Sequence, residues 1–239
     1  MDGGDINPTG CSVGTKQGFS ILKYSGNGSN AQAINHGLGA IPDFVICKNL
    51  GTNYNWFIWH NAFGNNANAG IYFTDGAKQT GYGTQPFGTF TTSSLVFNGV
   101  NDGVCGNYDY ICYAWKNIPG VQKFGEYIAN GSADGNFLEL GFRPALLWIK
   151  ATGSYSPGDW FVHDDKRDVY NPTAGDLQLS TYAAEGTVGS GYYVDFLSNG
   201  FKLRANGNGE NGAEGNTYIY CAWAHQPEHN LYGGQANGR

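Results

Sequence analysis

The sequence predicts an all-β protein built from two tandem antiparallel β-sandwich repeats of jelly-roll or lectin-like type, and three observations support this fold class. The 239 residues include 38 glycines, 15 % aromatic residues and only 13 % charged residues. Tyr, Phe, Trp and Val recur in short alternating runs between glycine-rich turns, and no stretch combines a helical period with helix caps. A β-branched and aromatic run that opens on Gly-Asn also occurs twice, over residues 106–115 and 215–223.

The two copies of this run set the two halves of the chain in register. Matched residues lie 102 to 108 positions apart, as in Asn27 and Asn130, Pro42 and Pro144, Trp56 and Trp160, and Tyr110 and Tyr218. A small drift with insertions confined to glycine-rich loops is typical of a tandem duplication. We expect the repeats to be separate or fused about a pseudo-twofold axis, with an arm or linker (1–17), a first repeat (18–120), a second repeat (121–228) and a tail (229–239).

Each repeat begins with an alternating strand that runs into an Asn-Gly pair, at Asn27-Gly28 and at Asn130-Gly131. Asn-Gly favours a type I′ turn, so we expect each repeat to open with a tight hairpin. The same residues, with the serine that follows them, make a glycosylation sequon. The turn is the favoured interpretation, because no secretory signal is visible.

The next strands follow Pro42 and Pro144 and cover residues 43–48 and 145–150. They are apolar on both faces, which predicts a central position in a sheet. Each ends in a lysine that is expected to reach solvent.

The tryptophan strands, residues 55–60 and 159–164, come third. Their histidines, His60 and His163, are expected to be hydrogen-bonded residues at the rim. Farther along the chain, Asn199-Gly200 between alternating runs predicts a hairpin. Tryptophans within strand runs are expected to pack in the core, and these are Trp56, Trp115, Trp148, Trp160 and Trp223.

Charge and cysteine content exclude several classes of protein. The formal charge is −6 without a run of like charges, so nucleic-acid binding is not expected. The five cysteines lack zinc-site spacing, and Cys112 and Cys221 are expected to be buried thiols, which fits synthesis in a reducing compartment. No signal peptide is visible and no run approaches the ~20 apolar residues of a spanning helix, so we expect a soluble protein without membrane insertion.

No cluster of residues indicates an enzyme active site, and we expect a protein without enzymatic activity. Glu126 and Glu139 flank the second predicted hairpin and are the first pair to consider for glycosidase chemistry, although solvated carboxylates are the favoured interpretation. His225 and His229 are four apart, but Pro227 between them argues against the helix that a metal-binding pair would need.

Aromatic residues in predicted loops are the best ligand-binding candidates, because sugars are held by aromatic faces with nearby amides and carboxylates. Calcium is the only cofactor that the sequence suggests. Residues 206–212 offer oxygen ligands, but they lack EF-hand spacing and a polar turn is favoured. The charged stretch 164–168 is expected to be a self-neutralising surface network or a subunit contact. The aromatic candidates are Tyr54, Tyr82, Tyr155 and Tyr170.

Several motifs taken together carry a resemblance. They are the strands ending at Tyr24 and Tyr127 with their Asn-Gly turns, residues 36–39 with Pro42 and Lys48, the Trp56 strand, residues 165–168, residues 196–201 and residues 218–220. In these motifs the chain resembles the tandem β-rich repeats of virion proteins from tailed bacteriophages, many with marine or cyanobacterial hosts, which include tail fibre and structural proteins. The resemblance spans residues 18–226 and implies a virion component. It brings no established catalytic residues.

We therefore expect a non-enzymatic bacteriophage virion protein, part of a tail fibre or similar appendage, that helps the particle bind host-surface glycan through several copies. The resemblance implies synthesis in the host cytoplasm, contacts with other virion proteins, and a homo-oligomer, since trimers are usual among phage fibres. Two alternatives stay open. One is a purely structural capsid or tail protein that makes fixed contacts, and the other is a polysaccharide depolymerase.

Overall fold

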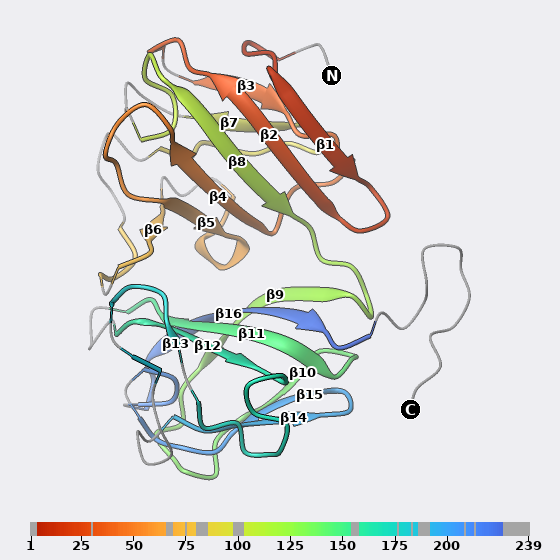
Figure 1. Ribbon diagram of the computed structural model, residues 1–239, viewed down its shortest axis with the longest axis vertical. Coiled ribbons are helices and arrows are strands. Elements are labelled where there is room, and N and C mark those ends of the chain that lie inside the picture. The colour runs from red at the N-terminus through yellow and green to blue at the C-terminus, as the bar shows by residue number, and fades with distance from the viewer. Residues whose placement is uncertain are drawn as a thin grey trace. The chain divides into compact units, whose positions relative to one another are not determined.

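The computed structural model shows an all-β protein that divides into two compact units (Figure 1). Unit 1 comprises Met1–Phe73 and Lys78–Asn117, and unit 2 comprises Thr74–Ala77 and Ile118–Arg239. The structure describes residues 4–29, 31–65, 69–74, 76–79, 86–97, 103–153, 158–175, 177–182, 184–185, 192–207, 209–212 and 214–226.

The larger sheet of unit 1 has six strands in the order β1-β2-β8-β4-β5-β6, all antiparallel, and a second sheet pairs β3 with β7. A 3-10 helix (Asn61–Phe63) follows β5. The strands are β1 (Gly10–Gly14), β2 (Phe19–Ser25), β3 (Gln32–Asn35), β4 (Phe44–Asn49), β5 (Phe57–His60), β6 (Ile71–Tyr72), β7 (Ser94–Phe97) and β8 (Asp109–Trp115).

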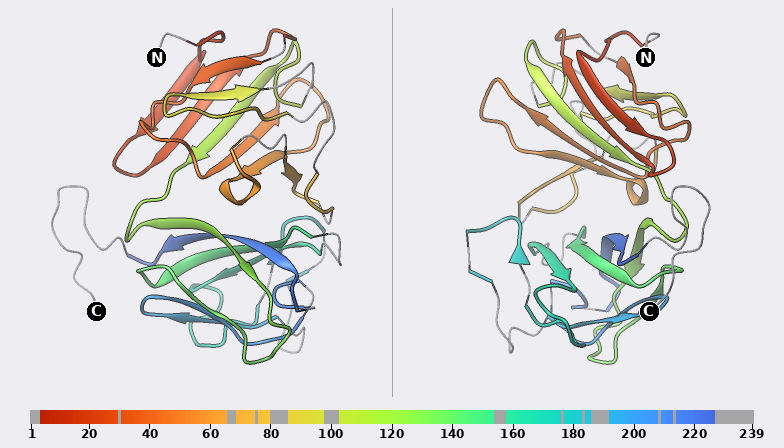
Figure 2. Two further views of the ribbon diagram at one scale, coloured as in Figure 1. Left: turned by 180° about the vertical axis from the view of Figure 1, so that it is seen from behind. Right: turned by 45° about the vertical axis from the view of Figure 1, so that its right-hand side comes forward.

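The two sheets of unit 1 pack face to face. Seen from behind, β7 lies in front of the larger sheet, which it covers on one side (Figure 2). The ring of Tyr24 in β2 stacks on Phe97 in β7, with centroids 5.4 Å apart, and on Tyr110 in β8 at 5.2 Å. All three rings are fully buried. Aromatic burial of this kind supplies much of the stability of a core.

Unit 2 has a five-stranded sheet in the order β13-β12-β11-β16-β9 and a three-stranded sheet in the order β10-β15-β14. Its strands are β9 (Gln122–Ile128), β10 (Phe137–Glu139), β11 (Pro144–Ala151), β12 (Trp160–Asp164), β13 (Leu177–Gln178), β14 (Val194–Leu197), β15 (Gly200–Leu203) and β16 (Thr217–Ala224).

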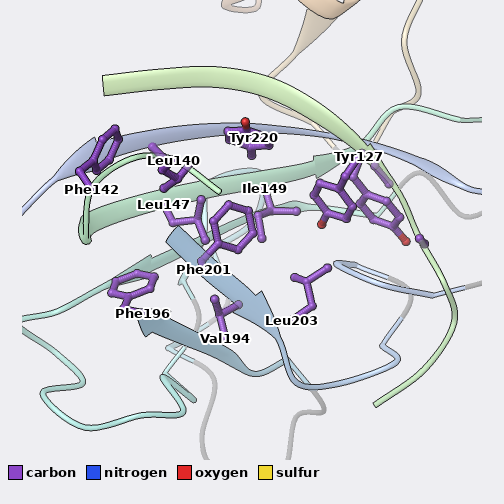
Figure 3. Packing of buried hydrophobic residues seen from close by; sticks show 14 residues of the cluster. Tyr127, Leu140, Phe142, Leu147, Ile149, Val194, Phe196, Phe201, Leu203 and Tyr220 are labelled. Carbon is purple, nitrogen blue, oxygen red and sulfur yellow. The ribbon is translucent and has the colours of Figure 1, made fainter. Parts of the chain in front are cut away.

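The core of unit 2 lies between these two sheets (Figure 3). Leu147 and Ile149 of β11 point toward Phe196 and Phe201 of the smaller sheet. The Phe201 ring also meets Tyr220 of β16, with centroids 5.5 Å apart. The expected sandwich architecture is therefore confirmed for this unit, and the reason is the period-2 alternation that turns every second side chain toward the facing sheet.

The two units share one strand order. The row β2-β8-β4-β5-β6 of unit 1 matches the row β9-β16-β11-β12-β13 of unit 2, and β3 and β10 each pair with a strand of the smaller sheet. An asparagine in each unit also binds a phenylalanine backbone 25 residues later through both amide atoms. Asn65 bonds Phe90 at 2.8 and 2.9 Å, and Asn171 bonds Phe196 at 2.9 and 2.8 Å.

The central position expected for residues 43–48 and 145–150 is confirmed, because β4 and β11 are interior strands. The hairpin at residues 194–203 is also confirmed, since Leu197 pairs with Gly200 around a Ser198-Asn199 turn.

The prediction that each repeat opens with a tight hairpin is wrong. β2 pairs with β1 and β8, whereas β3 pairs with β7, and in unit 2 the strands β9 and β10 likewise belong to different sheets. Gly28 and Gly131 have positive φ angles of 68° and 64°, but the asparagines before them do not. A type I′ turn needs both residues at positive φ, so the chain crosses to the other sheet here and does not fold back.

Three further expectations are corrected, one by strand pairing and two by burial. Residues 10–14, expected within an arm or linker, form the edge strand β1. Lys150 is fully buried and its ammonium donates to the carbonyl of Gly158, whereas Lys48 is half-buried. His60 and His163 are hydrogen-bonded, but both are fully buried and not at a rim.

Candidate functional site

Three aromatic side chains and one leucine stay exposed near one end of the larger sheet of unit 1, where β4 ends and β5 and β8 begin. Tyr54, Trp56 and Tyr108 keep 38 %, 37 % and 37 % of their surface exposed, and Leu50 keeps 52 %. We call these four residues the aromatic face. Large apolar side chains held in solvent at the same end of a rigid sheet are a feature of binding surfaces.

The loop that carries the aromatic face is held by a buried asparagine. Asn49, only 1 % exposed, accepts hydrogen bonds from the backbone N–H groups of Gly51 (2.8 Å) and Thr52 (3.0 Å). This Asx turn satisfies two backbone donors that the end of β4 would leave unpaired. The Lys48 ammonium donates to the carbonyl of Tyr54 and ties down the far side of the loop.

Two ring contacts position the aromatic face. A Cβ atom built on Gly51 would lie 2.8 Å from Cδ1 of Tyr108, so this ring lies directly against the glycine backbone. The Trp56 ring meets Phe73 edge to face, with centroids 6.2 Å apart. Because the Tyr108 and Trp56 rings are each in contact with a neighbour and are each more than one third exposed, they can meet an apolar ligand surface without being reordered.

Of the four predicted ligand-binding tyrosines, two lie within the described residues. Tyr54 belongs to the aromatic face, and Tyr170 is 82 % exposed in unit 2. The structure does not bring these two together within one unit. Tyr82 and Tyr155 lie outside the described residues.

The expectation that Trp56 packs in the core is wrong. The strand β5 begins one residue later, at Phe57, so Trp56 stands in the loop. Its counterpart Trp160 lies inside β12 and is fully buried, as expected. Tyr108 was missed because it stands next to the closing strand. The signal that could have placed Trp56 in a loop is the asparagine-rich stretch of residues 49–55, which is poor in strand formers.

The charged stretch 164–168 in unit 2 forms a network centred on Arg167. The guanidinium bonds Asp164 at 2.5 Å, Glu185 at 2.8 Å and two backbone carbonyls. Burial of Asp164 acts to raise its pKa, but the hydrogen bonds from Arg167 outweigh burial and lower it. Asp168 accepts from the backbone N–H groups of Ala174 and Gly175. The expected self-neutralising network is confirmed.

A second polar group in unit 2 is sealed from solvent. His163 contacts a carboxylate oxygen of Glu210, and its other ring nitrogen lies 3.1 Å from the hydroxyl of Thr173. None of the three side chains is more than 2 % exposed. The second oxygen of Glu210 is also buried and has no hydrogen-bond partner among the residues that the structure describes. Since no substrate can reach this group, it belongs to the fold and not to a binding site.

Among the described residues, no group of three or more His, Cys, Asp or Glu side chains could hold a metal ion. In the stretch considered for calcium, Glu210 turns inward to His163, and the buried Asn211 amide donates to Asn130, Ser132 and Ala205. His225 contacts Asp165, and His229 lies outside the described residues.

The proposed glycosidase pair loses its structural basis. Glu126 in β9 faces solvent opposite Ile219 of β16, and Glu139 in β10 is exposed opposite Gly200 of β15. The two glutamates therefore stand in different sheets and do not flank a hairpin.

The protein is therefore all-β and has two units built from antiparallel sheets. The first unit carries exposed aromatic residues at one end of its larger sheet. The chain belongs to a family described as a domain of unknown function (DUF7483), which it matches over residues 2–227. No curated protein and no solved structure matches the chain. In the part of the chain that the structure describes, no helix has the length and apolar character needed to cross a membrane.

Proposed function

We propose that this protein is a non-enzymatic component of a bacteriophage virion, part of a tail fibre or similar appendage, and that its aromatic face binds glycan on the host surface. The observation that supports this proposal is the exposure of Tyr54 and Trp56 in a loop that Asn49 holds by hydrogen bonds, together with the exposed Tyr108 that lies against Gly51 of that loop. The resemblance to phage virion repeats supports the particle assignment.

The chemistry of the aromatic face suits a carbohydrate. A sugar ring has an apolar C–H surface that can lie on an aromatic ring, and hydroxyl groups at its edge that need hydrogen-bond partners. Exposed polar residues, among them Thr52, Asn53 and Asn55, stand in the same loop as the rings. A site so open should bind each sugar weakly, and a homo-oligomer on the particle would multiply such contacts into useful avidity.

The test is a glycan array probed with the labelled full chain and with a Trp56→Ala/Tyr108→Ala double variant. We expect the wild-type chain to bind a defined set of glycans and the variant to bind them at least about tenfold more weakly, a loss of ~1.4 kcal/mol. Ile128→Ala is the matched control, because it truncates an exposed apolar side chain (62 % exposed) in unit 2. Binding that the double variant retains in full would refute the assignment of the site.

A purely structural role in the virion is the second candidate, and the surface of unit 2 favours it. Exposed apolar side chains lie around the edge strand β13 and the Arg167 network. Such a patch is suited to fixed contacts with other proteins of a particle. This role predicts no glycan binding on the array and protection of the patch in assembled particles. The patch contains Val169, Tyr170, Leu177, Leu179 and Tyr182.

A further inference from the structure

Two cysteines that are far apart in sequence face each other in unit 1. Cys47 in β4 and Cys112 in β8 are directly opposed in the antiparallel ladder, 65 residues apart along the chain. Both are fully buried, and their sulfur atoms are 2.6 Å apart. Cys112 was expected only to be a buried thiol, because spacing along the chain alone does not reveal a cross-strand partner.

The ladder pattern shows that this pair occupies the type of position where side chains come closest. The N–H of Leu50 donates to the carbonyl of Asp109 at 2.8 Å, which makes Leu50 and Asp109 a hydrogen-bonded pair. Hydrogen-bonded and non-hydrogen-bonded pairs alternate along an antiparallel ladder. The register is regular from Asn49 to Phe44, so the Cys47–Cys112 pair, three steps on, is non-hydrogen-bonded.

In a non-hydrogen-bonded pair the Cα atoms are about 4.5 Å apart. That separation falls within the range of about 4.4–6.8 Å that a disulfide spans without backbone movement. The backbone of β4 and β8 is therefore already placed for a covalent bond between the two sulfur atoms.

Unit 2 shows that the fold does not require sulfur at this position. The matching strands β11 and β16 pair in the same way, and there Ile149 stands opposite Tyr220. The cysteine pair is thus an addition to unit 1. The nearby Cys105 has its own partner, since its thiol lies 3.7 Å from the carbonyl of Ser29.

We propose that Cys47 and Cys112 form a disulfide bond that joins β4 to β8 inside the larger sheet of unit 1. The oxidant is a small-molecule disulfide such as oxidised glutathione. The two thiols lose two electrons and two protons, one sulfur–sulfur bond forms in the protein, and one molecule of oxidised glutathione becomes two molecules of reduced glutathione.

Burial decides when this bond can form and when it can be broken. A thiolate must attack the oxidant, and burial raises the pKa of the Cys112 thiol, which keeps it protonated and unreactive in the folded chain. The exchange therefore takes place while unit 1 is folding or open. Once the sheet closes, the same burial shields the bond from reductants.

The experiment refolds the full chain from denaturant in a glutathione redox buffer, alkylates the free thiols under denaturing conditions and maps the peptides by mass spectrometry. We expect a linked peptide pair carrying Cys47 and Cys112, with the other three cysteines alkylated. Five alkylated cysteines, or linkage of either residue mainly to another cysteine, would overturn the proposal.

Two further measurements separate the specific bond from non-specific oxidation. Refolded Cys112→Ala chain should show Cys47 alkylated, while Cys221→Ala, which removes a buried thiol from unit 2, should keep the linked pair. The wild-type bond should also survive dithiothreitol in the folded protein and be lost when denaturant is added. Rapid reduction in the folded protein would contradict its burial within the sheet.

Discussion

Removing the carboxylate of Glu210 should destabilise unit 2 far more than the loss of one side chain suggests. Glu210 and His163 are at most 2 % exposed and in direct contact. A Glu210→Leu variant leaves the imidazole and the Thr173 hydroxyl in a sealed pocket without the carboxylate. A buried hydrogen-bonding group left without its partner costs about 1–3 kcal/mol, and more where it is charged, which is a large share of the stability of a domain.

Unit 1 has apolar residues at the matching position. Trp59 pairs with Val45 as His163 pairs with Leu147, and the carbonyl of Val104 accepts a tyrosine hydroxyl as the carbonyl of Glu210 does. The apolar Trp59 and Val104 of unit 1 thus stand where unit 2 has His163 and Glu210.

A His163→Leu/Glu210→Leu double variant should therefore recover most of the lost stability, because it replaces the whole pair by apolar side chains of similar volume. The assay is urea unfolding of the full chain followed by tryptophan fluorescence and circular dichroism, for both single variants and the double variant. The coupling free energy should be at least about 2 kcal/mol. A Glu210→Leu variant within about 0.5 kcal/mol of wild type, or a double variant no more stable than the singles, would refute this account.

Gly200→Ala places a Cβ 2.1 Å from a backbone carbonyl oxygen of the paired strand β10 and should cost about 1–3 kcal/mol in urea unfolding, whereas Gly10→Ala, whose Cβ finds 3.8 Å of clearance, should be neutral. Burial raises the pKa of Tyr220 to about 12, against about 10 unfolded, so its contribution to stability is complete below pH 10 and declines as pH rises toward 12. Unfolding free energies measured across that window should fall less steeply for Tyr220→Phe, and equal slopes would exclude this residue as a cause. Closing the 65-residue loop between Cys47 and Cys112 should make the oxidised chain more stable than the reduced one by roughly 4 kcal/mol. This is measured as the difference between their free energies of unfolding, obtained from the urea midpoints and m-values.

The sequence predicted most of the strands, although it placed β1 in an arm or linker. Alternating aromatic and β-branched residues mark a half-buried strand wherever they occur, and continuous apolar runs mark the interior strands β4 and β11. The shared strand order of the two units is what the repeated motifs predict. A tandem duplication further predicts that unit 1 and unit 2 superpose on each other.

The Asn-Gly pairs misled because contacts with distant parts of the chain outweigh their local preference. They favour a hairpin turn, but Tyr24 of β2 and Tyr127 of β9 have hydroxyls that bond carbonyls 80 and 83 residues farther along, at Val104 and Glu210. These long-range contacts, and the strands that pair on both sides of β2, outweigh the local preference. The chain after Asn27 therefore continues to the other sheet.

The candidate sites divide in the same way between sequence and tertiary structure. Composition alone pointed to loop aromatics such as Tyr54, which the structure shows to be exposed, because residue type determines what a side chain can bind. Only the tertiary structure decided that Trp56 leaves the core, that Cys47 meets Cys112 and that His163 meets Glu210. Each of these facts depends on strand register between segments far apart in sequence, and a one-residue shift in register turns a side chain from the core to solvent.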